Sequence, residues 1–245
     1  MKKLLFYIMF FVLTFYGFAR AEFLTSFQGA YVYSSYNDVK LPGDSGTKLS
    51  YTDDLHCDPV LSPRIEAGYE FEFPVYIGVM ASLLRLEASG QLDKTVYYDG
   101  LVFNAGSEVK AKYRFDSYRI TGRYYFIDTE SFKIGAGFTG KIRDAEITLE
   151  EGDKKGGLKN RGAVPLLNFY AEWKVSEKIS LLFYGDGAWS PYGRAEDFFA
   201  GGLFRFNETA AVMAGYRMLE GGADNDEVYT FAMFHYAVLG VELRF

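Results

Sequence analysis

Apolar and polar residues alternate with a period of two along most of the chain, and this pattern constrains the fold more than any other feature. The alternation near the C-terminus is carried by Phe231, Met233, Ala237, Leu239, Val241, Leu243 and Phe245, and it is interrupted only by His235. Residues 62–73, 163–175 and 178–190 repeat it. Because successive side chains of a strand point to opposite faces, each segment predicts a strand with one apolar and one polar face.

The whole pattern predicts ten antiparallel strands. We place them at residues 22–36, 62–73, 75–88, 108–126, 132–150, 163–175, 178–190, 195–206, 209–220 and 228–245. Their connections alternate between tight turns and the long polar stretches 37–61, 89–107 and 151–162, and only the link at 191–194 is shorter than this rhythm suggests. Such a rhythm is typical of membrane barrels with short periplasmic turns and long outer loops. We therefore predict an all-β, closed antiparallel transmembrane barrel of about ten strands, with eight or twelve as alternatives.

The N-terminus carries an export signal. Lys2 and Lys3 precede an apolar run at residues 4–18, and Ala19-Arg20-Ala21 provides small residues at a cleavage site. The run is shorter than the roughly 20 residues that a membrane-spanning helix needs. We expect residues 1–21 to be a signal peptide and residues 22–245 to form one barrel domain with long outer loops.

Composition narrows the class of protein. Aromatic residues make up 18% of the chain, yet the mean hydropathy is only −0.06, as expected when one face of each strand is apolar. A soluble lipocalin-like barrel would not place large aromatic residues on its outer face. The net charge of −6 becomes more negative when the signal peptide leaves, which argues against a nucleic-acid partner. Cys57 is the single cysteine, so it cannot form an intramolecular disulfide.

The terminal segment Val241-Glu242-Leu243-Arg244-Phe245 resembles the last strand of bacterial outer-membrane β-barrels, whose final aromatic residue is read by the assembly machinery. The resemblance implies that Phe245 is an assembly signal and that the protein is located in the outer membrane of a Gram-negative bacterium. It also implies the barrel assembly machinery, outer-membrane lipid and lipopolysaccharide as partners. The pattern is specific for the general class of small outer-membrane barrels and assigns no narrower family.

An apolar outer face sends the charged face into the lumen. The residues that we expect there are Arg64, Glu66, Glu70, Arg85, Glu87, Arg119, Arg123, Lys141, Glu172, Asp186, Arg205, Arg217, Glu242 and Arg244. Both signs occur in similar numbers, and a confined charge is stable only when it is paired or hydrated. Since eight strands enclose little more than their own side chains, ten strands with many arginines should be nearly filled. We therefore favour a structural or narrow-pore role.

Two alternative functions stay open from the sequence. Asp53, Asp54 and His56 lie in the first outer loop, and an Asp/His set at the rim resembles that of omptin-type proteases. We favour solvated loop residues over a hydrolase, because the three come from one segment. His235 lacks the nearby serine of a lipid A deacylase, since Ala237 lies two positions on. No spacing indicates a metal site or a cofactor.

The strands at 108–126 and 132–150 are too long for the membrane and should project beyond its outer surface. A turn centred on Thr129 would pair Tyr113 with Ala145 and Arg114 with Asp144. The inward face of this projection is apolar, at Val109, Ala111, Tyr113, Phe115, Ala145, Ile147 and Leu149. We expect outer loops to cover it, with a hydrophobic ligand-binding barrel as the alternative.

Overall fold

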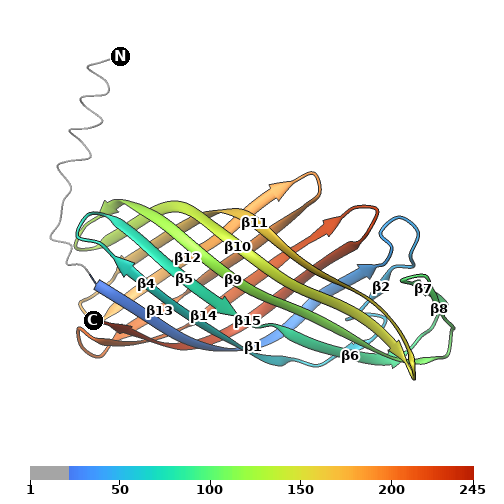
Figure 1. Cartoon of the computed structure of the whole chain (residues 1–245). Helices are drawn as coiled ribbons and strands as arrows, with labels where there is room; N and C mark the ends of the chain where they lie inside the picture. Colours follow the sequence, from blue (N-terminus) through green and yellow to red (C-terminus); the bar gives the residue numbers. More distant parts are fainter. Residues whose placement is uncertain (1–21) are drawn as a thin grey trace, which may run out of the picture.

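The computed structural model describes residues 22–245, which form a closed antiparallel barrel (Figure 1). Its ten spanning strands are β1 (Glu22–Lys40), β4 (Val60–Glu70), β5 (Val75–Ser82), β9 (Glu108–Asp128), β10 (Phe132–Glu151), β11 (Lys154–Lys174), β12 (Ile179–Ser190), β13 (Gly193–Arg205), β14 (Ala210–Asp224) and β15 (Tyr229–Arg244). Pairing of β1 with β15 closes the barrel, from Leu24 opposite Arg244 to Lys40 opposite Tyr229. The expected ten-stranded architecture is confirmed, whereas the predicted signal peptide lies outside the described residues.

Small polar residues fix the tight turns at one end of the barrel. The side-chain oxygen of Asn207 accepts hydrogen bonds from the backbone N–H groups of Thr209 and Ala210, at 2.9 and 2.8 Å. The hydroxyl oxygen of Thr129 accepts the N–H of Phe132 in the same way. These side chains replace the backbone partners that a reversing chain loses. The turns set which strands are neighbours, and the long loops gather at the opposite end.

A belt of apolar side chains surrounds the spanning part of the barrel. Exposed members include Phe27, Tyr31, Ile65, Val79, Ile120, Phe138, Leu167, Leu181, Phe183, Tyr216, Leu239 and Val241. On β10 the belt runs from Phe132 to Ile142. At about 3.3 Å per residue and a tilt of about 40°, this length spans about 25 Å, which is the height of the apolar band of outer-membrane barrels. The predicted lipid-facing surface is therefore present.

The belt ends abruptly toward the outer loops. Its last row on this side pairs Ile142 with Tyr118, both outward and about half exposed. The next outward row pairs Asp144 with Arg161, whose side chains form an ion pair of 2.7 Å. The Arg161 guanidinium holds the pKa of the Asp144 carboxyl below its usual range, so this pair is ionised. A change from apolar to ionic residues within one row marks the outer membrane surface.

Above that surface, β9, β10 and β11 continue as a long three-stranded extension. Residues 154–162, which the sequence had indicated as part of a loop, belong to β11, and a tight turn at Gly152 (φ +57°) joins it to β10. The loop prediction is wrong because Gly156, Gly157 and the charges around them have the composition of a loop. In the sheet, Gly157 instead allows close backbone approach, since a Cβ there would overlap the carbonyl of Ile147.

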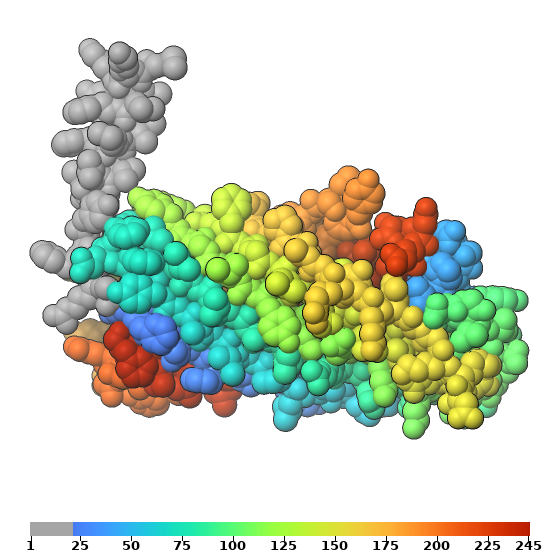
Figure 2. All heavy atoms as spheres, in the orientation of Figure 1, coloured from blue at the N-terminus to red at the C-terminus, as the bar shows by residue number. Residues whose placement is uncertain are grey.

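A cap of outer loops covers the upper half of the extension's inward face. It comprises residues 41–57 and 92–103, with β2 (Leu49–Ser50), β3 (His56–Cys57), β7 (Val96–Tyr98) and β8 (Leu101–Phe103), and it adjoins β6 (Arg85–Gln91). Its core consists of the fully buried Leu41, Leu49, Tyr51, Leu55, Leu92, Val96, Tyr98 and Phe103 packed on Val109, Ala111 and Leu149. In Figure 2, the green segment near residue 100 adjoins the yellow tip near residue 150, where Asp99 accepts the N–H of Gly157.

Two buried tyrosines tie the cap to the extension. The hydroxyls of Tyr51 and Tyr98 lie 3.1 Å apart. The Tyr51 hydroxyl also donates to the carbonyl oxygen of Thr148 at 3.1 Å. Burial raises the pKa of Tyr51 well above its usual range, as does the neighbouring Tyr98. The cap is therefore a packed element, and it covers part of the apolar patch that the sequence had placed at the mouth.

The register between β9 and β10 differs by two residues from our prediction. Asp128 pairs with Lys133 across a turn at 129–131, and a bulge beside Ile134 inserts one extra residue in β9. Tyr113 consequently pairs with Ile147 rather than Ala145. A turn wider than the one assumed and the bulge together cause the error. A shift of two keeps every side chain on its predicted face, so the inward apolar patch is unaffected.

This register predicts a specific crosslink. In a Cys57→Ser background, cysteines replacing Tyr113 and Ile147 should form a disulfide readily, because directly opposite residues have Cβ atoms about 5 Å apart. Cysteines replacing Tyr113 and Ala145 are diagonal neighbours about 7 to 8 Å apart and should react far more slowly. Mobility on non-reducing gels after mild oxidation measures both. Faster reaction of the Tyr113 and Ala145 pair would contradict the register.

The barrel wall has a discontinuity where β11 separates from β12. Pairing of β11 with β12 extends from Lys174 opposite Ser180 only up to Leu167 opposite Gly187. Pro165 follows directly above and has no N–H to offer a neighbouring strand. The part of β11 from residue 158 to 166 therefore pairs with β10 alone among the described strands. We call this stretch the free edge of β11.

Candidate functional site

A carboxylate at the centre of the lumen is the hub of the interior. Asp197 on β13 is 6% exposed and accepts two hydrogen bonds from Arg217 of β14, at 2.5 and 2.8 Å. Its Oδ2 also accepts a bond of 2.5 Å from Nη2 of Arg119, which lies on β9 across the barrel. Bonds to ionised partners are the stronger class of hydrogen bond. One carboxylate thus joins opposite walls.

Arg119 extends this arrangement to a second carboxylate. Its Nη1 donates to Oδ2 of Asp186 at 2.6 Å, so the guanidinium bridges two acids. The other oxygen of Asp186 accepts from Thr139 at 2.6 Å and from Asn168 at 2.8 Å. Since these residues belong to six successive strands, β9 to β14, the bonds cross-brace more than half of the wall.

Arg64 of β4 completes what we call the central cluster: Arg64, Arg119, Asp186, Asp197 and Arg217. Its Nη2 lies 3.2 Å from Glu66 and its Nη1 lies 4.0 Å from Asp197. The space left beside the cluster is about 20 Å³. A water molecule needs about 10 to 15 Å³ of such space. The lumen at this level therefore has room for about one water and not for a continuous channel.

Below the cluster, toward the short turns, further pairs fill the lumen. Glu172 is bound by Arg205 at 2.5 Å and by Ser180 at 2.7 Å. Glu70 is bound by Lys133 at 2.5 Å and by the Tyr125 hydroxyl at 2.8 Å. A cavity of about 70 Å³ remains at this level. The lower lumen can thus hold a few waters, enclosed by the cluster above.

Aromatic rings supplement the ion pairs of the lower lumen. Arg123 has its guanidinium carbon 5.0 Å from the Tyr76 ring centroid and 4.5 Å from that of Tyr170. Its Nε donates to the side-chain oxygen of Asn168 at 2.7 Å. Arg244 donates to Glu242 at 2.9 Å and to Glu22 at 3.3 Å. A buried guanidinium can be satisfied by ring faces where no carboxylate is adjacent.

Two residues expected in the lumen lie elsewhere. Arg85 and Glu87 are on the outward face of β6, with side chains 65% and 80% exposed. The segment 75–81 is apolar on both faces, so its sequence did not indicate whether the odd-numbered or the even-numbered residues point into the lumen. The buried Tyr76 and Met80 show that the even-numbered residues point inward. Conversely, Asp197 was missed because it adjoins Glu196 and two phenylalanines, where the alternation disappears.

The remaining expected residues point inward, and Lys141, like Arg123, lacks an acidic partner. Lys141 lies opposite Arg119 on the inward face and is 3% exposed. Arg119 takes both Asp186 and Asp197, and no carboxylate in residues 22–245 lies within 4.0 Å of Lys141 Nζ. The ammonium instead lies 4.6 Å from the ring centroid of Phe115. Lys141 is thus an uncompensated cation at the top of the central cluster.

The rim residues considered for catalysis do not form a site. Among residues 22–245, the His56 ring bonds only Asp58, at 3.1 Å, and both side chains are more than 80% exposed. Asp54 instead accepts the backbone N–H of Ser50 and lies 3.2 Å from Lys94, and Asp53 is exposed. Within residues 22–245 no group of three or more His, Cys, Asp or Glu could hold a metal ion. The three candidates therefore have separate partners.

His235 belongs to the outward face. Its Nδ1 lies 2.5 Å from the Tyr216 hydroxyl, and its ring stacks on Tyr33 with centroids 4.7 Å apart. Tyr33 and Tyr216 are each about half exposed. Amphipathic rings of this kind are typical of the interface between lipid and water. The arrangement offers no serine nucleophile beside the histidine.

Comparison with known proteins identifies the fold and its class. No family model and no curated protein matches the sequence. Among solved structures, the Escherichia coli outer-membrane protease OmpT aligns with a TM-score of 0.56 and 8% identity, over 91% of this chain and 97% of OmpT. The translocator domain of the Neisseria meningitidis autotransporter NalP aligns with a TM-score of 0.45 and 11% identity, over 100% and 96%. Neisserial surface protein A gives 0.37 and 13%, over 93% and 100%.

At these identities the likeness concerns the fold alone. A closed barrel with an apolar belt of membrane height, in the architecture of OmpT, defines a bacterial outer-membrane β-barrel protein. The chain is accordingly located in the outer membrane. The proteolytic activity in the name of OmpT belongs to that protein, and at 8% identity the likeness does not extend it to this chain.

Proposed function

We propose that this protein is a structural outer-membrane barrel whose lumen is closed by the central cluster. The bridge from Arg119 to Asp186 and Asp197 is the observation that carries the proposal, because it spans the lumen with bonds of 2.5 and 2.6 Å. Porins of roughly 16 to 18 strands leave an aqueous channel, whereas a barrel of this size is filled by its side chains. The closed lumen would serve as a rigid support for the cap and the extension.

Conductance tests this proposal directly. The refolded protein in a planar lipid bilayer should show no resolved current steps, because an ion passing the cluster would have to displace paired charges with no room for its own hydration shell. A trimeric porin of known conductance inserted in the same bilayer is the control. Regular steps of porin size from the folded protein would overturn the proposal.

We further propose lipopolysaccharide as the lipid partner of the extension. Directly above the apolar belt, the outward side chains of Arg85, Lys159 and Arg161 are 65%, 72% and 74% exposed. Their partners Asp116, Glu146 and Asp144 are 2%, 21% and 17% exposed. The surface at headgroup height is therefore cationic although the pairs balance in number. Phosphate groups of lipid headgroups would meet these cations.

A triple substitution tests the lipid partner. Replacing Arg85, Lys159 and Arg161 by glutamine should weaken binding of lipopolysaccharide to the micellar protein by about tenfold or more, because each surface cation contributes about 1 kcal/mol near an anionic membrane. Isothermal titration calorimetry measures the affinity. The matched control replaces Lys48, Lys94 and Lys155, which lie in the cap and at the hairpin tip. Equal losses in both triples would show that the contact is a nonspecific charge effect.

A further inference from the structure

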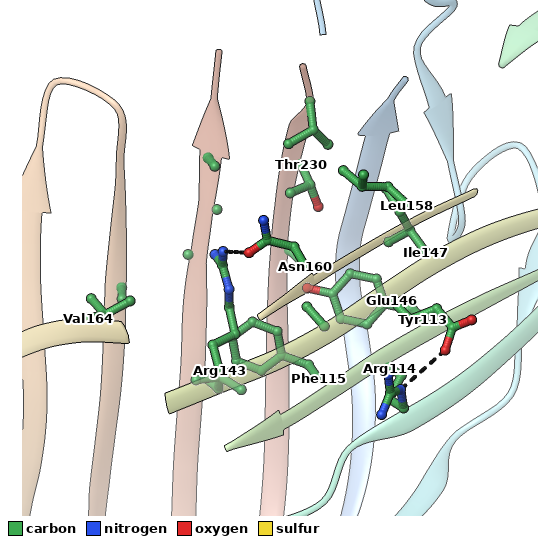
Figure 3. A pocket seen from close by; sticks show the side chains of 18 of the residues that line it. Tyr113, Arg114, Phe115, Arg143, Glu146, Ile147, Leu158, Asn160, Val164 and Thr230 are labelled. Atoms are coloured by element: carbon green, nitrogen blue, oxygen red, sulfur yellow. Dashed lines mark hydrogen bonds and ion pairs between the residues drawn. The ribbon is translucent and has the colours of Figure 1, made fainter. Parts of the chain in front are cut away.

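The lower half of the extension's inward face, which the cap leaves uncovered, lines a cavity of about 140 Å³ at the barrel mouth (Figure 3). One wall comes from β9, β10 and β11, and the other comes from β13, β14, β15 and the loop between β14 and β15. Its apolar lining includes Tyr113, Phe115, Ile147, Leu158, Leu219 and Phe234. This wall is the apolar patch seen in the sequence, so the patch is only partly used for packing.

The charges of the cavity are uneven. Arg114 is neutralised by Asp144 at 2.9 Å and by Glu146 at 3.3 Å, and Arg194 is neutralised by Glu220 at 2.7 Å. These pairs leave two further cations and the exposed Glu227 of the rim loop. The mouth cavity therefore differs from the central cluster, where each cation has an acidic partner.

The two cations without an acidic partner are Lys141 and Arg143, which follow one another on the inward face of β10. The Lys141 side chain is only 3% exposed and borders the floor of the cavity. Arg143 donates from Nη2 to the side-chain oxygen of Asn160, as Figure 3 shows, and its Nε is buried without a partner in the described structure. A buried cation without a partner costs several kcal/mol, which a bound anion would offset.

We propose that the mouth cavity binds a compact aromatic monocarboxylate, with its carboxylate held by Lys141 and Arg143 and its ring held by Tyr113, Phe115 and Phe234. The volume sets the size of the ligand, because an apolar cavity of about 150 Å³ accommodates one benzene ring. The charges set its class, since two adjacent donors match the two oxygens of one carboxylate. The central cluster closes the floor, so the ligand enters and leaves from the outer side.

Binding of benzoate to the folded protein in micelles is the first test. Calorimetric titration should show saturable binding of benzoate, with benzyl alcohol, benzylamine and acetate each binding about tenfold more weakly or worse, because each lacks either the charge or the ring. Benzyl alcohol binding as tightly as benzoate would overturn the role of the cations. Acetate binding as tightly as benzoate would indicate an anion site without the ring pocket and would also overturn the proposal.

Two variants locate the site. Lys141→Met keeps the chain length and removes the charge, and it should lower benzoate affinity about tenfold or more while leaving the protein folded. Ala145→Phe fills the cavity from its wall and should abolish binding while retaining both cations. Lys94→Met, in the cap, is the matched control and should bind normally. The urea midpoint of each variant establishes that it is folded.

The outcome of the benzoate-binding test is independent of whether the lumen conducts ions. If benzoate fails to saturate the wild-type protein at millimolar concentration, or if Lys141→Met and Ala145→Phe both bind it as the wild type does, the ligand assignment is wrong even when the bilayer shows no current. If the bilayer shows porin-like steps and these variants still lose binding, the closed lumen is wrong and the mouth site stands.

Discussion

Replacement of Asp197 by asparagine is expected to lower the free energy of unfolding by about 3 to 5 kcal/mol, the usual cost of removing one partner from a buried charge pair. Asparagine has nearly the same shape, so the loss comes from charge. Arg119 and Arg217 would both lose an ionised acceptor, at contacts of 2.5 to 2.8 Å. The midpoint of urea unfolding in lipid vesicles measures the change, and bilayer conductance should rise because the bridge across the lumen weakens.

The matched control is Glu87→Gln, which also converts an acid to its amide. Glu87 is 80% exposed and lies 3.9 Å from Lys112, so its removal should change stability by less than about 1 kcal/mol. A second comparison uses the double variant Asp197→Ala with Arg217→Ala, which should be less destabilised than the sum of the single changes. If Asp197→Asn is as stable as Glu87→Gln, the central cluster does not hold the barrel together.

Gly78→Val is expected to destabilise the barrel by about 3 kcal/mol through overpacking of the lower lumen and loss of a hydrogen bond to a carboxylate. The Tyr76 ring lies across Gly68 and Gly78, which pair in neighbouring strands. A Cβ at either glycine would overlap the phenol. The valine would displace Tyr76 from Glu66, whose carboxylate accepts its hydroxyl at 3.0 Å, and from Arg123.

Gly122→Val provides the control on the outward face of a spanning strand. A Cβ at Gly122 meets nothing within 4 Å, and valine is favourable both in strands and against lipid. This variant should be as stable as the wild type or slightly more stable. The same urea midpoint and the gel mobility of unboiled samples compare the two. Similar behaviour of Gly78→Val and Gly122→Val would show that Tyr76 does not depend on the glycine pair.

The sequence predicted the spanning part of the fold because lipid imposes a strict rule on each strand. Along residues 163–175 and 228–245, every second residue must be apolar, so the alternation alone assigns faces. The alternation failed to assign faces in strands that are apolar on both sides and in strands outside the membrane. Residues 75–81 are apolar on both faces, which misplaced Arg85 and Glu87, and outside the membrane a strand such as 154–162 needs no apolar face.

The interior network could be predicted only as a set of residues. Alternation indicated that Arg119, Asp186 and Arg217 face the lumen, but which of them bond depends on barrel stagger and on long-range register. Register itself shifted by two residues because the turn at 129–131 differs from the one assumed and a bulge beside Ile134 adds one residue to β9, and neither has a local sequence signal. Asp197, the hub, and Lys141, left without an acid, acquire their roles only from those three-dimensional pairings.

The free edge of β11 separates a wall that is hydrogen-bonded on both sides from one that is bonded on one side only. Below Leu167, each strand is held on both sides, whereas from 158 to 166 the amides that point away from β10 have no strand to bond. Hydrogen–deuterium exchange should therefore be fast along this edge and slow in the spanning ladder. Lys159, Arg161 and Pro165 lie on the edge and discourage another strand from adding to it. The part of β11 at residues 158–166 can thus move away from β12 while every bond of the central cluster stays intact.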